Sequence, residues 1–381
     1  MHVLYLIDSL VPGGAERSLA ALAPEYVRLG VRLDVAYLHE RDGLAAEIGA
    51  AGAELFPLAD GSGRLGWTRR AAALLRERKP DLLHTTLFES DIVGRFASLR
   101  TGTPVVCSLV NAAYGPEQLA NPALRPWKVR AAQFLDAATT RRVRRFHSVS
   151  VSVAQVMGRR LHVRADRIDV IPRGRDAKQL GTRTEARRAA ARAALGLGTE
   201  DAMVLAVGRH EYQKGFDVLV RAVDRLRGRD VPVKLFVAGR DGGATGALRV
   251  LIAELGLADS VELLGTRDDV AELLCAADVF AFPSRWEGSP GSVLEAMALE
   301  TPIVATGIAP IREVTDGPVC ARLVAVDDVD ALADAIAATL AGDGTAARVA
   351  AGRERFVAHY TIDRVAEEMV AFYSRALGLD S

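Results

Sequence analysis

Two glutamates, Glu287 and Glu295, stand at the start of an apolar segment. Glu287 is expected in a loop, and Glu295 about a turn and a half inside the helix that follows. Carboxylates can accept paired hydrogen bonds from vicinal hydroxyls, such as those of a ribose or a sugar ring. A solvated surface carboxylate is the alternative for Glu295, but residues 296–299 are apolar and predict a buried helix. The pair therefore indicates binding of hydroxyls rather than a general acid and base.

The small residues between these glutamates favour an anion. Ser289 has the residue type of a helix N-cap, and Pro290 suits the first helical position because its missing N–H would be unpaired there. The backbone N–H groups of Gly291 and Ser292, close to Gly288, would then point at the ligand. The Ser289 hydroxyl could compete for one of them.

Arg209 and Lys214 supply positive charge on a second loop, residues 208–215, which follows an apolar run. Arginine can grip a phosphate with two hydrogen bonds, whereas lysine supplies a mobile point charge. Both cations in one loop indicate a diphosphate; two solvated cations on a surface turn are the alternative. His210 is interpreted as a loop residue rather than a ligand.

A glycine pair, Gly13 and Gly14, follows the first apolar run and opens a helical pattern. Such a pair lets backbone N–H groups approach a phosphate at the positive end of the helix dipole. Since Arg17 follows in place of a third glycine, the dinucleotide-binding fingerprint is not matched. A purely structural turn remains the alternative.

Short apolar runs alternate with amphipathic segments of helix length along the whole chain. Runs of about four to eight residues suit strands buried on both faces, so the pattern predicts βαβ units with parallel strands. A polar, Arg- and Ala-rich stretch, residues 173–201, is interpreted as an interdomain connection. The sequence therefore predicts an α/β fold of two doubly wound, Rossmann-like domains that face each other across a cleft. The predicted strands are 3–7, 33–38, 53–58, 82–85, 104–109, 147–151, 168–171, 203–207, 234–238, 261–264, 279–282, 303–305 and 323–326.

The composition is that of a folded protein without a dominant charge. The 381 residues exceed the roughly 250–300 at which one core stops growing. Lys plus Arg and Asp plus Glu are balanced at 48 each, so the net charge predicts no nucleic-acid partner. The three cysteines match no metal spacing, and Cys107 and Cys275, which lie in apolar runs, are expected as buried thiols. With no apolar run of about 20 residues and no signal-peptide pattern at the start, a cytoplasmic location is expected.

In their order along the chain, these motifs resemble glycosyltransferase family 4, a group of retaining enzymes with the GT-B fold. The resemblance covers nearly the whole chain, and the ordered set is far more specific than any one fragment. The fragments are Gly-Gly-Ala-Glu at 13–16, Asp-Leu-Leu-His at 81–84, Ile-Pro-x-Gly at 171–174, Gly-Arg at 208–209, Lys-Gly at 214–215, Ala-Asp-Val-Phe-x-Phe-Pro-Ser at 277–284, the Glu287/Glu295 pair with Ala-Met-Ala at 296–298, and Pro-Ile-Val-Ala-Thr at 302–306.

The resemblance implies a role for each motif. Gly14 would lend its N–H to the donor diphosphate, with Arg209 and Lys214 as cationic partners, while Glu287 would hold the donor sugar and Glu295 the ribose. The implied catalytic residues are Arg209, Lys214 and Glu287. The implied donor-binding residues are Gly13, Gly14, Arg209, Lys214, Thr266, Arg267, Glu287, Gly288, Ser289, Gly291, Ser292 and Glu295.

The resemblance also implies a mechanism. The co-substrate would be a nucleotide-diphosphate sugar, with UDP expected from its frequency in the family, and no metal or other cofactor would be needed. Asp268–Asp269 and Asp327–Asp328 are accordingly interpreted as acids of loops or helix starts. Arg209, Lys214 and helix N-termini would stabilise the leaving diphosphate, and attack from the same face would retain the configuration.

The acceptor is expected to be a hydroxyl of a glycan, a lipid-linked molecule or a small molecule. For His84, capping of a strand end is the alternative to acceptor contact. Asn111 stands where many relatives carry a His near the reacting sugar, and Arg173 where relatives often carry Asn. The candidate acceptor-side residues are Glu16, His84, Glu89, Asp91 and Asn111, the middle three of which are placed on a loop after the strand 82–85.

The expected domains are residues 1–175 on the acceptor side and 176–362 on the donor side, with a helix in 363–381 that returns to the first domain as in GT-B relatives. The tracts Trp127–Arg130 and Arg141–Arg145 are basic. A solvated helix end, leading into the strand after Phe146, is favoured for them. A weak peripheral contact with the inner face of the cell membrane is the alternative.

Three other classes of protein share parts of this pattern. A Rossmann oxidoreductase would need the glycine fingerprint and an acid at the end of the second strand, whereas Asp34 lies inside that strand. A non-enzymatic sugar-binding protein of two domains would need export. A nucleotide-sugar epimerase of the same fold would convert its donor without any acceptor.

Overall fold

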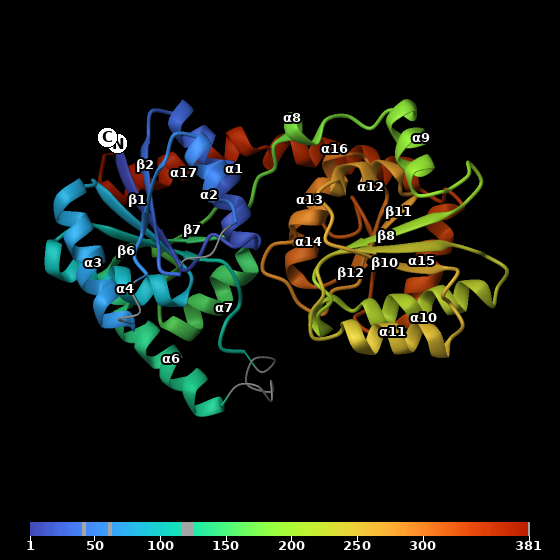
Figure 1. Ribbon diagram of the computed structural model, residues 1–381, viewed down its shortest axis with the longest axis horizontal. Helices are drawn as coiled ribbons and strands as arrows, with labels where there is room; N and C mark the ends of the chain where they lie inside the picture. Colours follow the sequence, from blue (N-terminus) through green and yellow to red (C-terminus); the bar gives the residue numbers. More distant parts are fainter. Residues whose placement is uncertain (40–42, 60–62, 116–124, 380–381) are drawn as a thin grey trace. The chain divides into compact units, whose positions relative to one another are not determined.

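The computed structural model describes residues 1–39, 43–59, 63–115 and 125–379 of the chain. The polypeptide divides into two compact units (Figure 1). Unit 1 comprises Met1–Gly174 and Ile362–Ser381, and unit 2 comprises Arg175–Thr361. Each unit has its own parallel sheet with helices on both faces, so the predicted pair of Rossmann-like α/β domains is confirmed.

Unit 1 is built on a seven-stranded sheet in the order β3-β2-β1-β4-β5-β6-β7. Its central strands β4 and β5 are buried at every position, as expected for strands covered on both faces. The strands are β1 (His2–Ile7), β2 (Arg32–Tyr37), β3 (Glu54–Pro57), β4 (Leu82–Thr86), β5 (Val105–Leu109), β6 (Val143–Ser148) and β7 (Ile168–Val170).

Helices cover both faces of this sheet. On one face, α17 packs against α1, and the hydroxyls of Tyr26 and Tyr373 lie 3.1 Å apart within the core. On the other face, α3, α4 and α7 bury Leu75, Val93 and Val153. The helices are α1 (Gly14–Arg28), α2 (Ala45–Ala50), α3 (Gly63–Arg78), α4 (Phe88–Thr101), α6 (Pro126–Thr139), α7 (Val151–Leu161) and α17 (Ile362–Leu377), with short 3-10 turns η1 (Thr140–Arg142) and η2 (Ala165–Arg167).

Unit 2 carries a six-stranded sheet in the order β10-β9-β8-β11-β12-β13. Two separate apolar clusters, one around Phe280 and one around Val223, fill the spaces between this sheet and its helices. The strands are β8 (Met203–Val207), β9 (Lys234–Ala238), β10 (Val261–Gly265), β11 (Val279–Phe282), β12 (Ile303–Thr306) and β13 (Arg322–Val324). The helices are α8 (Ala177–Leu180), α9 (Glu185–Ala194), η3 (Tyr212–Lys214), α10 (Phe216–Arg227), α11 (Thr245–Glu254), α12 (Val270–Ala276), α13 (Gly291–Ala298), α14 (Ala309–Thr315), α15 (Val329–Leu340) and α16 (Thr345–His359).

Two predicted boundaries are wrong. The strand predicted at 147–151 is β6 (Val143–Ser148). Its first residues were missed because the charged Arg144 and Arg145 interrupt the apolar run. The stretch 173–201 is not a free connection, since most of it packs on unit 2. Arg188 and Arg192 both donate to the Asp278 carboxylate, at 2.6 and 3.2 Å.

Each sheet reverses its strand order at one point. In unit 1, β2 and β3 lie on one side of β1, whereas β4 to β7 lie on its other side. The strand order therefore reverses between β1 and β4. In unit 2 the corresponding pair is β8 and β11. Ligands of doubly wound sheets bind beyond the carboxyl ends of the strands at this switch point.

Candidate functional site

The loops that follow β8 and β11 are joined to one another at the switch point of unit 2. The Arg285 backbone N–H donates to the Gln213 carbonyl at 2.8 Å, and Gln213 Nε2 donates to the Trp286 carbonyl at 2.7 Å. Gly215 closes the first loop with φ +65°, and a Cβ there would collide with the Pro283 carbonyl. The two loops therefore form one rigid surface.

Lys214 and Glu287 meet on this surface. Lys214 Nζ donates to Glu287 Oε1 at 2.5 Å and lies 5.2 Å from the centroid of the Phe282 ring. The Glu287 side chain is only 8% exposed. Two residues predicted separately as diphosphate and sugar ligands are thus in direct contact, and each neutralises the other.

Arg209 lies on the same loop as Lys214 but points to solvent. Among the residues that the structure describes, its guanidinium forms no hydrogen bond or ion pair. It follows Gly208 directly after β8, at the carboxyl end of the central strand. An unpaired arginine here can bind an incoming phosphate without first breaking an internal contact.

The N-terminus of α13 differs by one residue from the prediction. Pro290 occupies the N-cap position, Gly291 is the first helical residue, and no side chain caps the helix. The prediction of Ser289 as N-cap is wrong because the Pro290 carbonyl accepts the first helical bonds, from Val293 at 3.1 Å and Leu294 at 3.4 Å. No described residue accepts a hydrogen bond from the backbone N–H of Gly291 or Ser292. These two donors can therefore receive an anion.

Glu295 has a partner that the sequence did not indicate. Arg175 Nε donates to Glu295 Oε1 at 2.6 Å, and both side chains are mostly buried. The Arg175 guanidinium also lies against Gly291, where it would overlap any added Cβ. The two residues are far apart in sequence and follow different strands, so only the fold reveals that this arginine belongs to the site.

Thr266 and Arg267 follow β10, at the same edge of the unit 2 sheet. Arg267 forms a forked pair with Asp269, with nitrogen–oxygen distances of 2.7 and 2.5 Å, while Thr266 is exposed. The strand β9 lies between β10 and β8, and within the described residues Lys214 forms its ion pair with Glu287 rather than with this loop. Asp328 accepts from Ala331 N–H at 2.9 Å and caps α15, which confirms its interpretation as a helix-start acid.

In unit 1, Gly13 and Gly14 do open α1 as predicted. Gly13 is the N-cap and Gly14 the first helical residue. The Glu16 carboxylate folds back over Gly13, and the Arg173 guanidinium lies over Gly14. Burial raises the pKa of Glu16, while the backbone N–H groups of Glu16 and Ala15 and the charge of Arg173 oppose this rise. The helix N-terminus predicted for a phosphate thus holds the chain's own carboxylate and guanidinium.

The predicted position of His84 on a loop is wrong. It lies inside β4 and is 1% exposed, since it belongs to a strand covered on both faces. Its Nδ1 is 2.7 Å from the Tyr373 hydroxyl, and its Nε2 is 2.7 Å from Ser108 Oγ. Burial, with a smaller contribution from His147, holds the pKa of His84 well below its usual value. Both ring nitrogens are engaged inside the core, away from any acceptor at the sheet edge.

The hydrogen bonds of His84 belong to a longer buried chain. Ser108 Oγ lies 2.7 Å from His147 Nδ1, and His147 Nε2 lies 2.9 Å from the Ile171 carbonyl. Burial lowers the pKa of His147 to about 4, so this ring is neutral at pH 7. A cavity of about 30 Å³ borders the chain between Tyr5 and Arg173, which is room for roughly one water molecule.

Glu89 and Asp91 lie in the first turn of α4 rather than on a loop. Leu87, with φ +80°, is the only residue between β4 and α4, so the helix begins at Phe88 and the predicted loop is absent. Glu89 remains near the edge and pairs with Arg64 at 2.8 Å and with His39 at 3.2 Å. Asp91 is turned into the interior. Asn111 is exposed just beyond β5, at the same edge of the sheet as Glu89.

Asp8, at the end of β1, was missed by sequence reasoning. Its Oδ1 accepts hydrogen bonds from Ser90 N–H at 2.8 Å and Ser90 Oγ at 2.6 Å, which joins the end of β1 to the first turn of α4 at the switch point. Burial raises the pKa of Asp8, and the nearby Glu89 carboxylate adds to this rise. The position of this acid directly after the first strand was the available signal.

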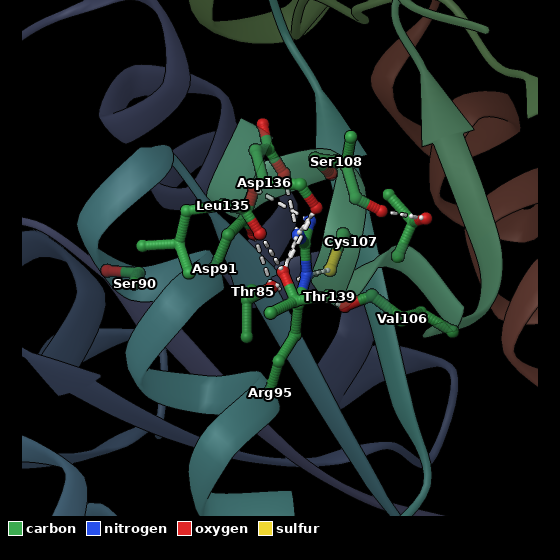
Figure 2. A network of polar contacts seen from close by, with 12 residues as sticks. Thr85, Ser90, Asp91, Arg95, Val106, Cys107, Ser108, Leu135, Asp136 and Thr139 are labelled. Atoms are coloured by element: carbon green, nitrogen blue, oxygen red, sulfur yellow. Dashed lines mark hydrogen bonds and ion pairs between the residues drawn. The ribbon is translucent and has the colours of Figure 1, made fainter. Parts of the chain in front are cut away.

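Asp91 belongs to a buried network around Arg95, which Figure 2 shows reaching from α4 toward Asp136. Arg95 Nη1 donates to Asp136 Oδ1 at 2.6 Å, and Nη2 lies 3.5 Å from Asp91 Oδ2. Thr85 donates to Asp91 Oδ1 at 2.5 Å. Burial raises the pKa of Asp91 to about 7, and this rise is opposed by the charge of Arg95. The network is a structural anchor between β4, α4 and α6.

All three cysteines are free and buried, as was predicted for Cys107 and Cys275. Within the described ranges, no group of three His, Cys, Asp or Glu residues has a geometry suited to a metal ion. None of the helices in the described part of the chain has both the length and the apolar character needed to span a bilayer.

The two Rossmann-like units have the GT-B fold, which several solved structures share. The Anabaena protein HepE in complex with UDP matches with a TM-score of 0.85 at 21% identity, covering 98% of this chain and 100% of that chain. Sucrose-phosphate synthase from Thermosynechococcus elongatus matches with a TM-score of 0.83 at 22% identity, with 100% of both chains covered.

Sequence comparison then defines the family. Residues 12–179 match the family described as Glycosyltransferase Family 4, and residues 201–342 match Glycosyl transferases group 1. The D-inositol 3-phosphate glycosyltransferase of Xylanimonas cellulosilytica is 32% identical over 321 residues, which is 81% of this chain and 75% of the relative. The D-inositol 3-phosphate glycosyltransferase of Mycobacterium avium is 31% identical over 310 residues, which is 78% of this chain and 70% of the relative. The chain belongs to glycosyltransferase family 4, and it is a glycosyltransferase.

Proposed function

We propose that this enzyme transfers a sugar from a UDP-sugar to an acceptor hydroxyl, with retention of configuration and without a metal ion. The observation that carries the proposal is the surface at the switch point of unit 2. There Arg209, the Lys214–Glu287 pair and the unpaired N–H groups of Gly291 and Ser292 follow two adjacent strands. Such a set suits a diphosphate that carries a sugar.

In this proposal the donor exchanges places with the internal ion pair. The β-phosphate would draw Lys214 away from Glu287, and the freed carboxylate would accept hydrogen bonds from the sugar hydroxyls. The carbon–oxygen bond to the β-phosphate breaks, and its electron pair remains on the leaving oxygen. Arg209, Lys214 and the N-terminus of α13 stabilise the charge that develops there.

Retention would follow from attack on the same face of the sugar. The acceptor oxygen forms the new bond to the anomeric carbon while its proton passes to the leaving phosphate oxygen. No protein nucleophile takes part in this sequence. The neutral side chain of Asn111 is consistent with such a route because it can orient a hydroxyl but cannot take its proton.

The choice of UDP is supported by one structural relative, the Anabaena protein HepE, which was solved in complex with UDP and in complex with UDP-glucose. The curated relatives are named for D-inositol 3-phosphate, a phosphorylated polyol. An acceptor of this chemistry would suit the edge of the unit 1 sheet, where Asp8 and Glu89 offer carboxylates for hydroxyls and Arg173 offers a guanidinium for a phosphate.

Thermal unfolding with UDP, GDP, ADP and their sugars tests the donor, because bound ligand raises the apparent stability. UDP and one UDP-sugar are expected to raise the midpoint most, and the shift is expected to persist in EDTA. A larger shift with GDP or ADP would contradict the choice of base. Incubation with donor alone separates an epimerase, which would change the sugar, from a transferase, which needs an acceptor.

A further inference from the structure

Helix α6 (Pro126–Thr139) is held to unit 1 by one face only. Val129 and Asp136, seven residues apart and therefore on the same face, are its two buried side chains. Asp136 is bound by the buried Arg95 at 2.6 Å and also accepts from the Tyr114 hydroxyl at 2.8 Å. Figure 1 shows α6 as an outer helix of unit 1. These contacts fix its rotation about its own axis.

The opposite face of α6 carries an apolar stripe that faces solvent. Trp127, Ala131, Phe134 and Ala138 follow the spacing i, i+4, i+7 and i+11, which places them in one line along a helix. Trp127 is 62% exposed and Phe134 is 76% exposed, and both alanines are exposed as well. In the usual arrangement a surface helix turns such a stripe toward the core, so here the orientation is reversed.

Positive charge borders the stripe on both sides. Lys128 and Arg130 precede and follow the buried Val129, so they flank the line of Trp127 and Ala131. Lys128 Nζ lies 5.8 Å from the centroid of the Trp127 ring. The exposed Arg141 and Arg142 extend this charge past the end of the helix, whereas the single acid of α6 is the buried Asp136.

We propose that this face of α6 docks on an anionic lipid surface. Aromatic side chains at the level of the headgroups, with flanking cations that bind lipid phosphates, are the features of a helix lying in a membrane interface. The absence of an exposed acid on α6 makes a lipid surface of negative charge the best complement. The proposal concerns unit 1 alone and does not depend on the sugar that is transferred.

Sedimentation of the full chain with vesicles tests the proposal. Vesicles with about one third phosphatidylglycerol in phosphatidylcholine are expected to bind the protein in low salt, and 0.5 M salt is expected to release most of it. The Trp127→Ser/Phe134→Ser variant and the Lys128→Glu/Arg130→Glu variant are each expected to lose at least about tenfold in the partition coefficient. The matched control Leu65→Ser/Val250→Ser removes two exposed apolar side chains from α3 and α11, and it should bind vesicles as the unmodified protein does.

All variants are expected to keep the unfolding temperature and the UDP-induced shift, which separates this proposal from that for the donor site. The proposal would be overturned by no sedimentation of the unmodified protein with anionic vesicles, or by equal sedimentation of the Trp127→Ser/Phe134→Ser variant. A dimer in light scattering that this variant abolishes would also overturn it, because the stripe would then be an interface between two copies.

Discussion

At the scale of single residues, the Lys214–Glu287 contact joins the two side chains that are proposed to bind the donor. The pair lies 2.5 Å apart at the end of two adjacent strands, with the carboxylate nearly buried. Buried charges are stable only when paired, and in this contact each group compensates the charge of the other. A donor that offers a phosphate to one and hydroxyls to the other can replace this contact without leaving either group unpaired.

Replacement of Glu287 by alanine should separate sugar binding from nucleotide binding. Because the carboxylate is assigned to the sugar hydroxyls, transfer should fall about 100-fold, whereas the dissociation constant for UDP should stay the same or decrease. Steady-state kinetics and calorimetry measure the two quantities. Glu254→Ala, at an exposed position in α11, is the control and should change neither. Equal weakening of UDP and UDP-sugar would contradict the assignment.

The protonation of Asp91 should appear in the pH dependence of stability. Its folded-state pKa is raised to about 7 by burial, from a usual value near 3.8. Between these two pH values the folded state holds a proton that the unfolded state has lost, so stability falls as pH rises from about 4 to about 7. The slope from this group is about 1.4 kcal/mol per pH unit.

Urea unfolding of the wild type and of Asp91→Asn across this pH range measures the effect. Asparagine resembles the protonated acid in shape and charge, so the difference between the two proteins should grow in favour of the variant as pH rises. A constant difference from pH 4 to pH 7 would show that Asp91 is ionised throughout.

At the scale of elements, the N-terminus of α13 should respond to a single methyl group. In Gly291→Ala the new Cβ would overlap the Arg175 guanidinium and push it away from Glu295. We expect the affinity for UDP-sugar to fall about tenfold, which is about 1.4 kcal/mol. Gly246→Ala is the matched control, since a Cβ in α11 meets no atom within 4 Å. Unchanged affinity in Gly291→Ala would exclude this helix end from the donor site.

The helix α17 is joined to the sheet of unit 1 through Tyr373. Its hydroxyl lies 2.7 Å from His84 Nδ1 and 3.1 Å from the Tyr26 hydroxyl, all within the core. Tyr373→Phe leaves a buried imidazole nitrogen unpaired and should cost about 1–3 kcal/mol in the free energy of unfolding. Tyr26→Phe keeps the bond to His84 and should cost less. Equal losses in urea unfolding would contradict this order.

Several elements followed directly from the sequence. Apolar runs such as 203–207 and 279–282 predicted β8 and β11 because strands covered on both faces tolerate few polar residues. The start of β6 was harder to predict, since Arg144 and Arg145 lie in this strand, near the sheet edge, and interrupt its apolar run. Two helix starts were predicted to within a residue, that of α1 from the pair Gly13–Gly14 and that of α13 from Ser289 and Pro290.

Only part of the candidate site could be predicted from the sequence. Lys214 and Glu287 could be named because each follows a strand, but their contact depends on the adjacency of β8 and β11, which spacing does not give. Arg175 was missed for this reason. His84 was misplaced because a histidine within a strand and one at its end look alike in sequence, and only the partners Ser108 and Tyr373 distinguish them.

At the scale of the whole molecule, the two doubly wound units have similar groups at their switch points. Each presents a glycine-opened helix and polar loops at its switch point, and each carries an arginine from the segment Arg173–Arg175 on that helix, over Gly14 in unit 1 and over Gly291 in unit 2. Membership of glycosyltransferase family 4 explains the architecture. The division of labour between the units, with the donor on unit 2, remains the prediction to be tested.

Calorimetric titration of UDP into the wild type and Lys214→Ala, with EDTA present, tests whether Lys214 binds the donor diphosphate. We expect one UDP per chain for the wild type and at least about tenfold weaker binding for the variant, while Lys178→Ala, which changes an exposed lysine of α8, should behave as the wild type. Equal affinity of Lys214→Ala and the wild type, or no binding of UDP to either, would contradict the account.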